Sequence, residues 1–301
     1  MTGPSSPRTR KVALPGRAIS LLEWGRPDSP PLLLIHGIRD HAYTWQPLAE
    51  ALAQTHRVIA PDLRGHGDSD WCRAYNLHDY VSDVAGVTDA LGLSSLAVVG
   101  HSLGGHIALR YVACFPERVA CLCSSEGVEL PIMRDQRKNP RTYAQRLREW
   151  LDRQAASEQR SPRLYAGHAE AKARMAQEHP ALDDDTLVLI VEHGLKPADG
   201  GYVWKYDNAC RHRAPEDASG RDVDDLLAGI TCPVLLAYGD ASWIPVPPAE
   251  RLAKLTDYRL IRFPGAGHWL HHEARRPFLS ALQAFLAATS THSQNESPFH
   301  A

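Results

Sequence analysis

Short, uninterrupted apolar runs alternate with amphipathic stretches along most of this chain, and the alternation restricts its fold more than any other feature. Typical runs are PPLLLIHG at 30–37, LAVVG at 96–100 and CPVLLAYG at 232–239. Strands that are buried on both faces of a parallel sheet have this continuous apolar character, and helices supply the crossovers between them. The sequence therefore predicts an α/β fold, with a mostly parallel central sheet flanked by helices.

The alternation is lost in the middle of the chain, where helical spacing dominates. There an apolar stripe runs from Tyr143 to Leu151, and DDDTLVLIVEHG begins with capping aspartates and ends at Gly194. We interpret this region as a helical cap inserted into the core. The first tail ends in a strand-like piece, RKVALPG, and a closing helix is expected from about Arg276 to Ala287. The expected organisation is a flexible tail at 1–18, an α/β core at 19–127 and 231–288, a cap at 128–230 and a second flexible tail at 289–301.

Composition excludes several classes of protein. The formal charge of −2, with 44% hydrophobic and 23% charged residues, is typical of a globular protein and does not favour nucleic acid or an anionic membrane as a partner. No apolar run approaches the ~18 residues of a membrane span, and the N-terminus lacks the core of a secretory signal, so we expect a cytoplasmic protein. Six scattered cysteines favour neither a disulfide framework nor a metal site, and no cofactor is implied.

The segment VVGHSLGG places Gly100-His101-Ser102-Leu103-Gly104 directly after an expected strand and before an expected helix. This is the G-x-S-x-G pattern of a nucleophile elbow. A tight strand-to-helix turn strains the central residue, so the positions two residues away on either side must be nearly free of side chain. The turn would lift the Ser102 hydroxyl above the sheet, at the positive end of the next helix.

The segment LLLIHGIRDH ends another expected strand at the same edge of the sheet, where parallel α/β folds bind ligands. Glycine at position 37 lets the backbone approach a ligand closely. We therefore expect His36 and Gly37 to border a substrate pocket. The backbone N–H groups of Ile38 and Leu103 are the candidate oxyanion hole, each worth about 10²-fold or more in rate.

One of the sixteen histidines stands where a general base would be expected. His268 follows the last expected strand, in the glycine-rich loop RFPGAGHWLHHE. His101 is expected to pack sideways beside the nucleophile. His271 and His272 are expected to face solvent or the start of the closing helix.

Taken together, HGIRD, PDLRGHGDS, VVGHSLGGHIALRYV and FPGAGHWLHHE resemble the α/β-hydrolase fold superfamily in content and order, from about residue 20 to 288. The resemblance implies a nucleophile, an acid and a histidine in that order along the chain. It implies a cofactor-free mechanism in which Ser102 is the nucleophile and His268 the base. No metal is implied.

The position of the acid departs from the common pattern of the family. Relatives commonly place an aspartate three residues after a glycine that ends the seventh strand, and here that position is Ser242. Two carboxylates remain as candidates. Asp240 lies two residues early, and Glu126 lies at the end of VACLCSSEG. Some relatives, among them haloalkane dehalogenases and serine-hydrolase-like proteins, take their acid from the end of the sixth strand, so we favour Glu126 and keep Asp240 as the alternative.

Aromatic residues near the expected site can line an apolar pocket, and we expect this of Trp243 and Trp269, although core packing is an alternative for both. The predicted activity is that of a serine hydrolase, closest in motif to carboxylesterases, acting on a small-molecule ester or thioester. Alternatives on the same triad are a C–C bond hydrolase, a lactonase and an acyltransferase. A noncatalytic ligand receptor is a further alternative. The natural substrate and the oligomeric state stay open.

Overall fold

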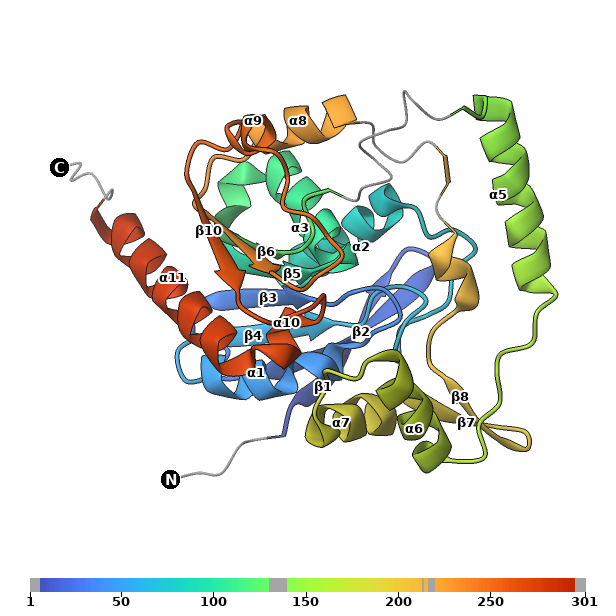
Figure 1. Ribbon diagram of the computed structural model, residues 1–301. Coiled ribbons are helices and arrows are strands. Elements are labelled where there is room, and N and C mark those ends of the chain that lie inside the picture. Colours follow the sequence, from blue (N-terminus) through green and yellow to red (C-terminus); the bar gives the residue numbers. More distant parts are fainter. Residues whose placement is uncertain (1–5, 130–139, 213, 216–219, 296–301) are drawn as a thin grey trace.

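The computed structural model describes residues 6–129, 140–212, 214–215 and 220–295. Its main sheet has eight strands in the order β1-β2-β4-β3-β5-β6-β9-β10, and the six strands from β4 to β10 in that order run parallel (Figure 1). The strands are β1 (Arg8–Leu14), β2 (Arg17–Trp24), β3 (Pro31–Ile35), β4 (Arg57–Pro61), β5 (Leu96–His101), β6 (Val119–Ser125), β9 (Val234–Gly239) and β10 (Tyr258–Phe263). The α/β fold expected from the sequence is confirmed.

Helices cover both faces of the sheet (Figure 1). One apolar cluster packs helices α2 (Leu77–Ala90), α3 (Leu103–Cys114) and α8 (Gly220–Ala228) against one face. The other cluster packs α1 (Gln46–Leu52) and α11 (Arg275–Asn295) against the opposite face. Short helical turns join these elements: η1 (Ala42–Trp45), η2 (Pro116–Arg118), α9 (Ala249–Leu252) and α10 (Leu270–Glu273). The continuous apolar strands are explained by this double coverage, since all six residues of β5 are buried.

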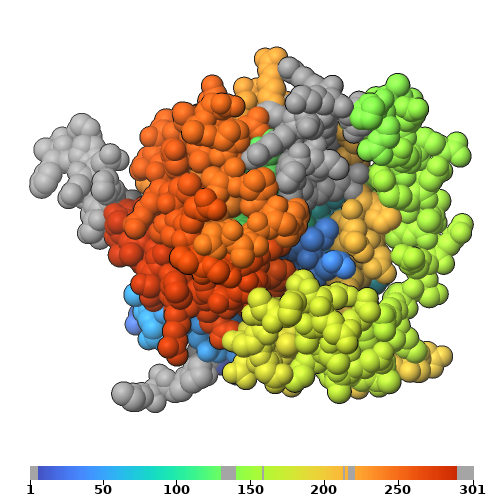
Figure 2. Space-filling model, in the orientation of Figure 1, coloured from blue at the N-terminus to red at the C-terminus, as the bar shows by residue number. Residues whose placement is uncertain are grey.

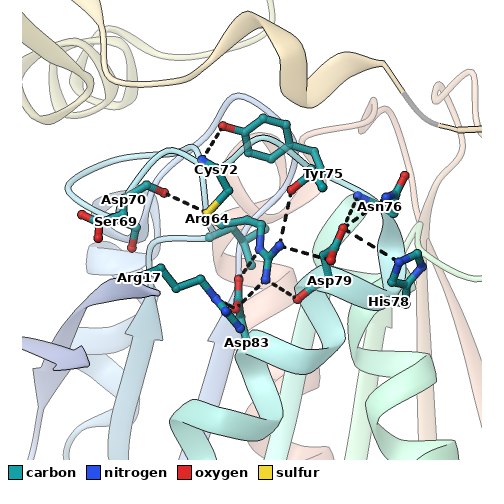
Figure 3. A network of polar contacts seen from close by, with 12 residues as sticks. Arg17, Arg64, Ser69, Asp70, Cys72, Tyr75, Asn76, His78, Asp79 and Asp83 are labelled. Atoms are coloured by element: carbon teal, nitrogen blue, oxygen red, sulfur yellow. Dashed lines mark hydrogen bonds and ion pairs between the residues drawn. The ribbon is translucent and has the colours of Figure 1, made fainter. Parts of the chain in front are cut away.

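A network of charged side chains braces the loop between β4 and α2. Asp83 on α2 accepts hydrogen bonds from Arg17 and Arg64, and Arg64 also donates to the Asp79 carbonyl at 2.9 Å (Figure 3). Asp83 is buried. Burial of a carboxylate is tolerated here because two guanidinium groups compensate its charge.

The cap contains the helices α5 (Tyr143–Glu158), α6 (His168–Glu178) and α7 (Asp184–Gly194), together with a hairpin of β7 (Leu195–Ala198) and β8 (Gly201–Trp204) and the turn η4 (Asn208–Arg211). The hairpin was not expected in a helical cap. Its strands are four residues long, too short for a period-two pattern to be distinct. Residues 130–139, 213 and 216–219 of the expected cap lie outside the described residues.

The structure differs from the expected boundaries at three places. The tail expected at 1–18 contains β1, an edge strand of the sheet whose exposed residues are mostly charged. Arg8 and Arg10 form ion pairs with Glu23 on β2. The expected cap contains α8, whose Val223 and Leu227 belong to the main core cluster. The tail expected at 289–301 is helical through Asn295, because no glycine or proline interrupts α11 there. Residues 1–5 and 296–301 lie outside the description. None of the helices in the described part of the chain has the length and apolar character needed to cross a bilayer.

Candidate active site

Ser102 occupies a sharp turn between β5 and α3. Its backbone φ of 52° lies in the left-handed region, which is uncommon outside glycine and concentrates at functional sites. A Cβ added at Gly100 would come within 2.3 Å of the Gly104 carbonyl oxygen, and one added at Gly104 would come within 2.1 Å of the Ile35 oxygen. Both flanking glycines are therefore required by the turn, as the G-x-S-x-G pattern predicts.

The structure brings Ser102, His268 and Glu126 into one hydrogen-bonded line. His268 Nε2 lies 3.0 Å from Ser102 Oγ, and His268 Nδ1 lies 2.5 Å from Glu126 Oε2. A carboxylate can only accept, so Nδ1 carries the proton and Nε2 is left with a lone pair facing the serine hydroxyl. This is the tautomer that a general base needs.

Glu126 is held from several sides. It is fully buried, and its φ of 52° repeats that of Ser102 at the end of the neighbouring strand β6. The Gly239 N–H donates to Glu126 Oε1 at 2.9 Å, and the Ser242 hydroxyl donates to Oε2 at 2.7 Å. These donors fix the orientation of the carboxylate toward His268.

Ser242 is a residue whose contribution the sequence interpretation missed. It stands at the position where relatives commonly have the catalytic aspartate, and the sequence assigned it no role. Its hydroxyl instead donates to the carboxylate of Glu126, while the Ile244 N–H donates to the same hydroxyl at 3.1 Å. The serine hydroxyl could have indicated this role from the sequence, because a serine at position 242 can donate a hydrogen bond to an acid at the end of the neighbouring strand β6.

Asp240, the alternative acid, is not brought to the histidine. It is exposed, and its Oδ1 accepts a hydrogen bond from the Gly265 N–H at 2.5 Å. The bond closes the turn between β9 and the loop after β10. Asp240 therefore has a local structural role in this arrangement, while Glu126 contacts the imidazole.

The two proposed oxyanion donors come from elements that meet at Ser102. A Cβ placed on Gly37 would lie 3.5 Å from the Cβ of Ser102, so the backbone after β3 passes close to the nucleophile. Ile38 lines the same cavity as Ser102. Leu103 is the first residue of α3, where backbone N–H groups have no partner within the helix. The structure thus brings Ile38, Leu103 and Ser102 into one neighbourhood.

His36, expected at the pocket, does not line the cavity. Its side chain is fully buried, its Nε2 accepts from the Leu63 N–H at 2.9 Å, and its Nδ1 donates to the Gly37 carbonyl at 2.7 Å. Burial lowers the pKa of His36 well below its ordinary value. Both nitrogens are used to hold backbone segments, so His36 shapes the loop that carries Gly37 and does not border the pocket.

A cavity of about 660 Å³ opens over the serine between the core and the cap. In Figure 2 a recess lies between the orange C-terminal segment and the yellow cap, with blue atoms of the N-terminal half visible in it. Trp243 and Trp269 both line the cavity as expected. Trp243 is 65% exposed, and its ring centre lies 5.2 Å from that of His268. Met175, Trp204 and Tyr206 complete an apolar wall from the cap side.

Three other histidines near the site are buried. His101 packs sideways as expected, and its ring lies 4.9 Å from that of His268. His271 and His272 are also buried, so they do not face solvent; of the two expected environments, the start of the closing helix holds for His271, whose ring lies 6.5 Å from that of Phe278 in α11. The reason is that α10 turns inward, and His271 packs against Trp45 with ring centres 4.8 Å apart. Burial lowers the pKa of His272 to about 3 and that of His271 well below its ordinary value.

Comparisons with known proteins show the family to which the chain belongs. The sequence profile of the alpha/beta hydrolase fold family matches residues 30–274. The chain is 26% identical to 2-(acetamidomethylene)succinate hydrolase of Mesorhizobium japonicum, over 93% of this chain and 95% of that protein. It is 30% identical to a serine hydrolase-like protein of Danio rerio, over 61% of this chain and 57% of the relative's length. A solved thioesterase domain from the curacin biosynthetic pathway superposes with a TM-score of 0.80 and 27% identity, covering 93% of this chain and all of that domain.

Proposed function

This chain is a hydrolase of the alpha/beta hydrolase fold family, and we propose that it cleaves a carboxylic ester or thioester through an acyl-enzyme on Ser102. The observation that carries the proposal is the line of hydrogen bonds from Ser102 through His268 to Glu126. A hydroxyl, an imidazole and a buried carboxylate in that order form the arrangement that activates a serine nucleophile.

The proposed chemistry proceeds in two halves. As Ser102 Oγ attacks the acyl carbon, His268 Nε2 takes the hydroxyl proton, and the negative charge that develops on the carbonyl oxygen is met by the N–H groups of Ile38 and Leu103. Collapse of the tetrahedral intermediate breaks the bond to the alcohol or thiol, which leaves with the proton from His268. Water then attacks the acyl-enzyme by the same steps in reverse. Glu126 keeps the imidazole in place and balances its positive charge.

The cavity supports a small-molecule substrate. Its volume of about 660 Å³ falls within the range of drug-sized sites, and its wall combines aromatic residues with several charged side chains, among them Arg39, Glu178 and Glu273. A C–C bond, a lactone or an acyl acceptor other than water would use the same machinery, and substrate profiling separates these outcomes.

A second candidate is a substrate that carries a carboxylate next to the scissile group. Arg39 directly follows the proposed oxyanion donor, lines the cavity, is exposed and makes no ion pair within the described part of the chain. The relative from Mesorhizobium japonicum is named for a succinate derivative. We expect Arg39→Met to lower kcat/KM for mono-p-nitrophenyl succinate at least tenfold more than for p-nitrophenyl butyrate. Equal losses on both esters would argue against a carboxylate partner.

The test of the activity itself is labelling with a fluorophosphonate, joined to a chain-length panel of p-nitrophenyl esters. Wild type and the control Ser95→Ala, which changes an exposed serine outside the cavity, should be labelled and active. Ser102→Ala should lose labelling and at least about 10³-fold in kcat. Folded wild-type protein that neither labels nor turns over any ester would refute the proposal and would favour a ligand receptor.

A further inference from the structure

Three buried side chains that are potential metal ligands meet directly behind His268. Asp40 lies in the loop after β3, His101 at the end of β5 and His271 in α10, and one ligand atom of each lies within 4.8 Å of the other two. All three residues are less than 4% exposed. The sequence implied no metal, and these three residues stand far apart in the chain.

The hydrogen bond made by His101 determines which of its nitrogens is available. Its Nε2 lies 2.8 Å from the carbonyl oxygen of His268. A carbonyl oxygen can only accept, so Nε2 carries the hydrogen, and burial keeps the ring neutral by lowering the pKa of His101 well below its ordinary value. The remaining Nδ1 therefore presents a lone pair, and it has no hydrogen-bond partner in the described structure.

His271 and Asp40 also have atoms that are available to bind an ion. Both ring nitrogens of His271 are buried without a partner among the described residues. Asp40 is oriented by the His41 N–H, which donates to Oδ1 at 2.8 Å, and by the Thr44 hydroxyl, which donates to Oδ2 at 3.2 Å. Each of these oxygens keeps a further lone pair. Native proteins rarely leave buried polar atoms unpaired, and such a group calls for a ligand that the protein atoms alone do not supply.

The surroundings also provide space and access. A Cβ on Gly37 would lie 3.0 Å from His101 Nδ1, so glycine at this position keeps the nitrogen unobstructed. Asp40 and His101 both border the cavity that contains Ser102, which gives an ion a path from solvent.

We propose that Asp40, His101 and His271 form a binding site for a divalent transition metal such as Zn²⁺. Two imidazoles and a carboxylate are ligands that Zn²⁺ favours, at about 2.0–2.2 Å, and water from the cavity can take the fourth position. The ligand atoms lie within 4.8 Å of one another, and their side chains must rotate toward a common centre to bind one ion. The bond from His101 to the His268 carbonyl is the outer support that metal-bound histidines ordinarily have.

This support has a functional consequence, which rests on the proposed function. The carbonyl held by His101 belongs to the residue assigned as the general base. An ion that pulls His101 toward Asp40 and His271 shifts or stiffens the backbone of His268, and its distance to Ser102 changes. The metal is therefore expected to act as a reversible inhibitor of hydrolysis, independent of competition with substrate.

Calorimetric titration of chelator-treated protein with ZnCl₂ tests the site without reference to activity. Wild type should bind one ion tightly, and His271→Gln should weaken that binding at least 100-fold. His272→Gln is the matched control, because the neighbouring residue lies on the same short helix, is equally buried and is not part of the trio. Its affinity should stay within threefold of wild type. Equal affinity in wild type and His271→Gln would overturn the proposal and leave a buried water as the occupant.

Two further measurements keep the test decisive. If His271→Gln does not fold, anomalous diffraction from a Zn²⁺-soaked crystal of wild type should place the ion between the three side chains. Anomalous signal found only at other positions would refute the site. In assays with p-nitrophenyl acetate, Zn²⁺ should inhibit wild type and His272→Gln, with recovery on adding EDTA, and should leave His271→Gln at least tenfold less sensitive. Binding at the site without any inhibition would overturn the inhibitory role. A protein without esterase activity would refute the proposed function and leave the calorimetric result standing.

Discussion

At the scale of single residues, the two carboxylates considered for the triad have different surroundings. Glu126 is buried and contacts His268, whereas Asp240 is exposed and accepts from the Gly265 N–H. We expect Glu126→Gln to lower kcat by about 10³-fold or more, because an amide cannot balance the imidazolium and can favour the wrong tautomer. Asp240→Asn should lose less than about threefold. Steady-state kinetics on one ester decides the assignment, and the reverse order of losses would transfer the role to Asp240.

Ser242 belongs to the same scale as a positioning residue. Ser242→Ala removes one of the two hydrogen bonds that Oε2 of Glu126 accepts and leaves the one from His268, so kcat should fall about tenfold. KM should change little, since the hydroxyl faces the carboxylate and not the cavity. Ser242→Thr keeps the hydroxyl and should restore most of the rate. A loss confined to KM, or an equal loss in both variants, would contradict this role.

The sequence predicted Ser102 and His268 as catalytic residues, because the turn that holds the serine and the loop that holds the histidine have specific motifs. It did not decide which carboxylate is the acid of the triad. The reason is that nothing in the local sequence shows that Glu126, 142 residues from His268, contacts it in preference to Asp240. His36 was misplaced for a related reason. Whether a histidine is buried depends on how distant elements pack, and polar character alone favours an exposed position.

At the scale of elements, the turn between β5 and α3 depends on the absence of side chains. In Gly104→Ala the new Cβ would meet the carbonyl oxygens of Ile35 and His36 at 2.1 and 2.7 Å, and neither backbone atom can move without disturbing β3. We expect a loss of about 3 kcal/mol or more in the free energy of unfolding. Gly167→Ala is the control, because no atom lies within 4 Å of its Cβ position and its φ is 179°. Urea denaturation measures both, and equal midpoints would disprove the steric argument.

Elements were predictable where burial alone set their pattern. The strands β3, β5 and β9 were expected close to their observed bounds, because burial on both faces of the sheet makes their apolar runs continuous. The cap was harder. The β7–β8 hairpin is stabilised partly by a distant bridge between Tyr165 and Tyr202, and α8 was assigned to the cap although it packs on α3. Neither contact has a local signature.

At the scale of the whole molecule, a group of buried histidines couples stability to pH. Burial lowers the pKa of His41 and His66 to about 4 and that of His272 to about 3. In the unfolded chain each ring regains an ordinary pKa near 6.5 and binds a proton at higher pH than in the fold. The unfolded state therefore binds more protons between pH 6.5 and 4, and the free energy of unfolding falls as the pH is lowered through this window. His36, His101 and His271 act in the same direction.

Two buried carboxyl groups oppose this effect. Burial raises the pKa of Asp40 to about 8 and that of Asp62 to about 6, so the folded state holds protons that the unfolded chain releases. Their contribution to stability is lost as the pH rises toward 8. Because the histidines outnumber them, we expect Tm to peak near pH 6.5–7, to fall steeply toward pH 5 and to decline gently toward pH 8. Thermal unfolding followed by circular dichroism across that range is the measurement, and a Tm that rises from pH 6.5 to 5 would contradict the expectation.

Strands β6 and β9 are neighbours, and the Ser242 hydroxyl after β9 meets the Glu126 carboxylate after β6 at the oxygen that contacts His268. A descendant or ancestor with carboxylates on both strands would keep a working partner for the histidine at every step, the two groups sharing a proton as close carboxyl pairs do. The acid can thus migrate between strands through two single substitutions without an inactive intermediate. The position of the acid in the sequence can then differ between relatives that catalyse the same reaction.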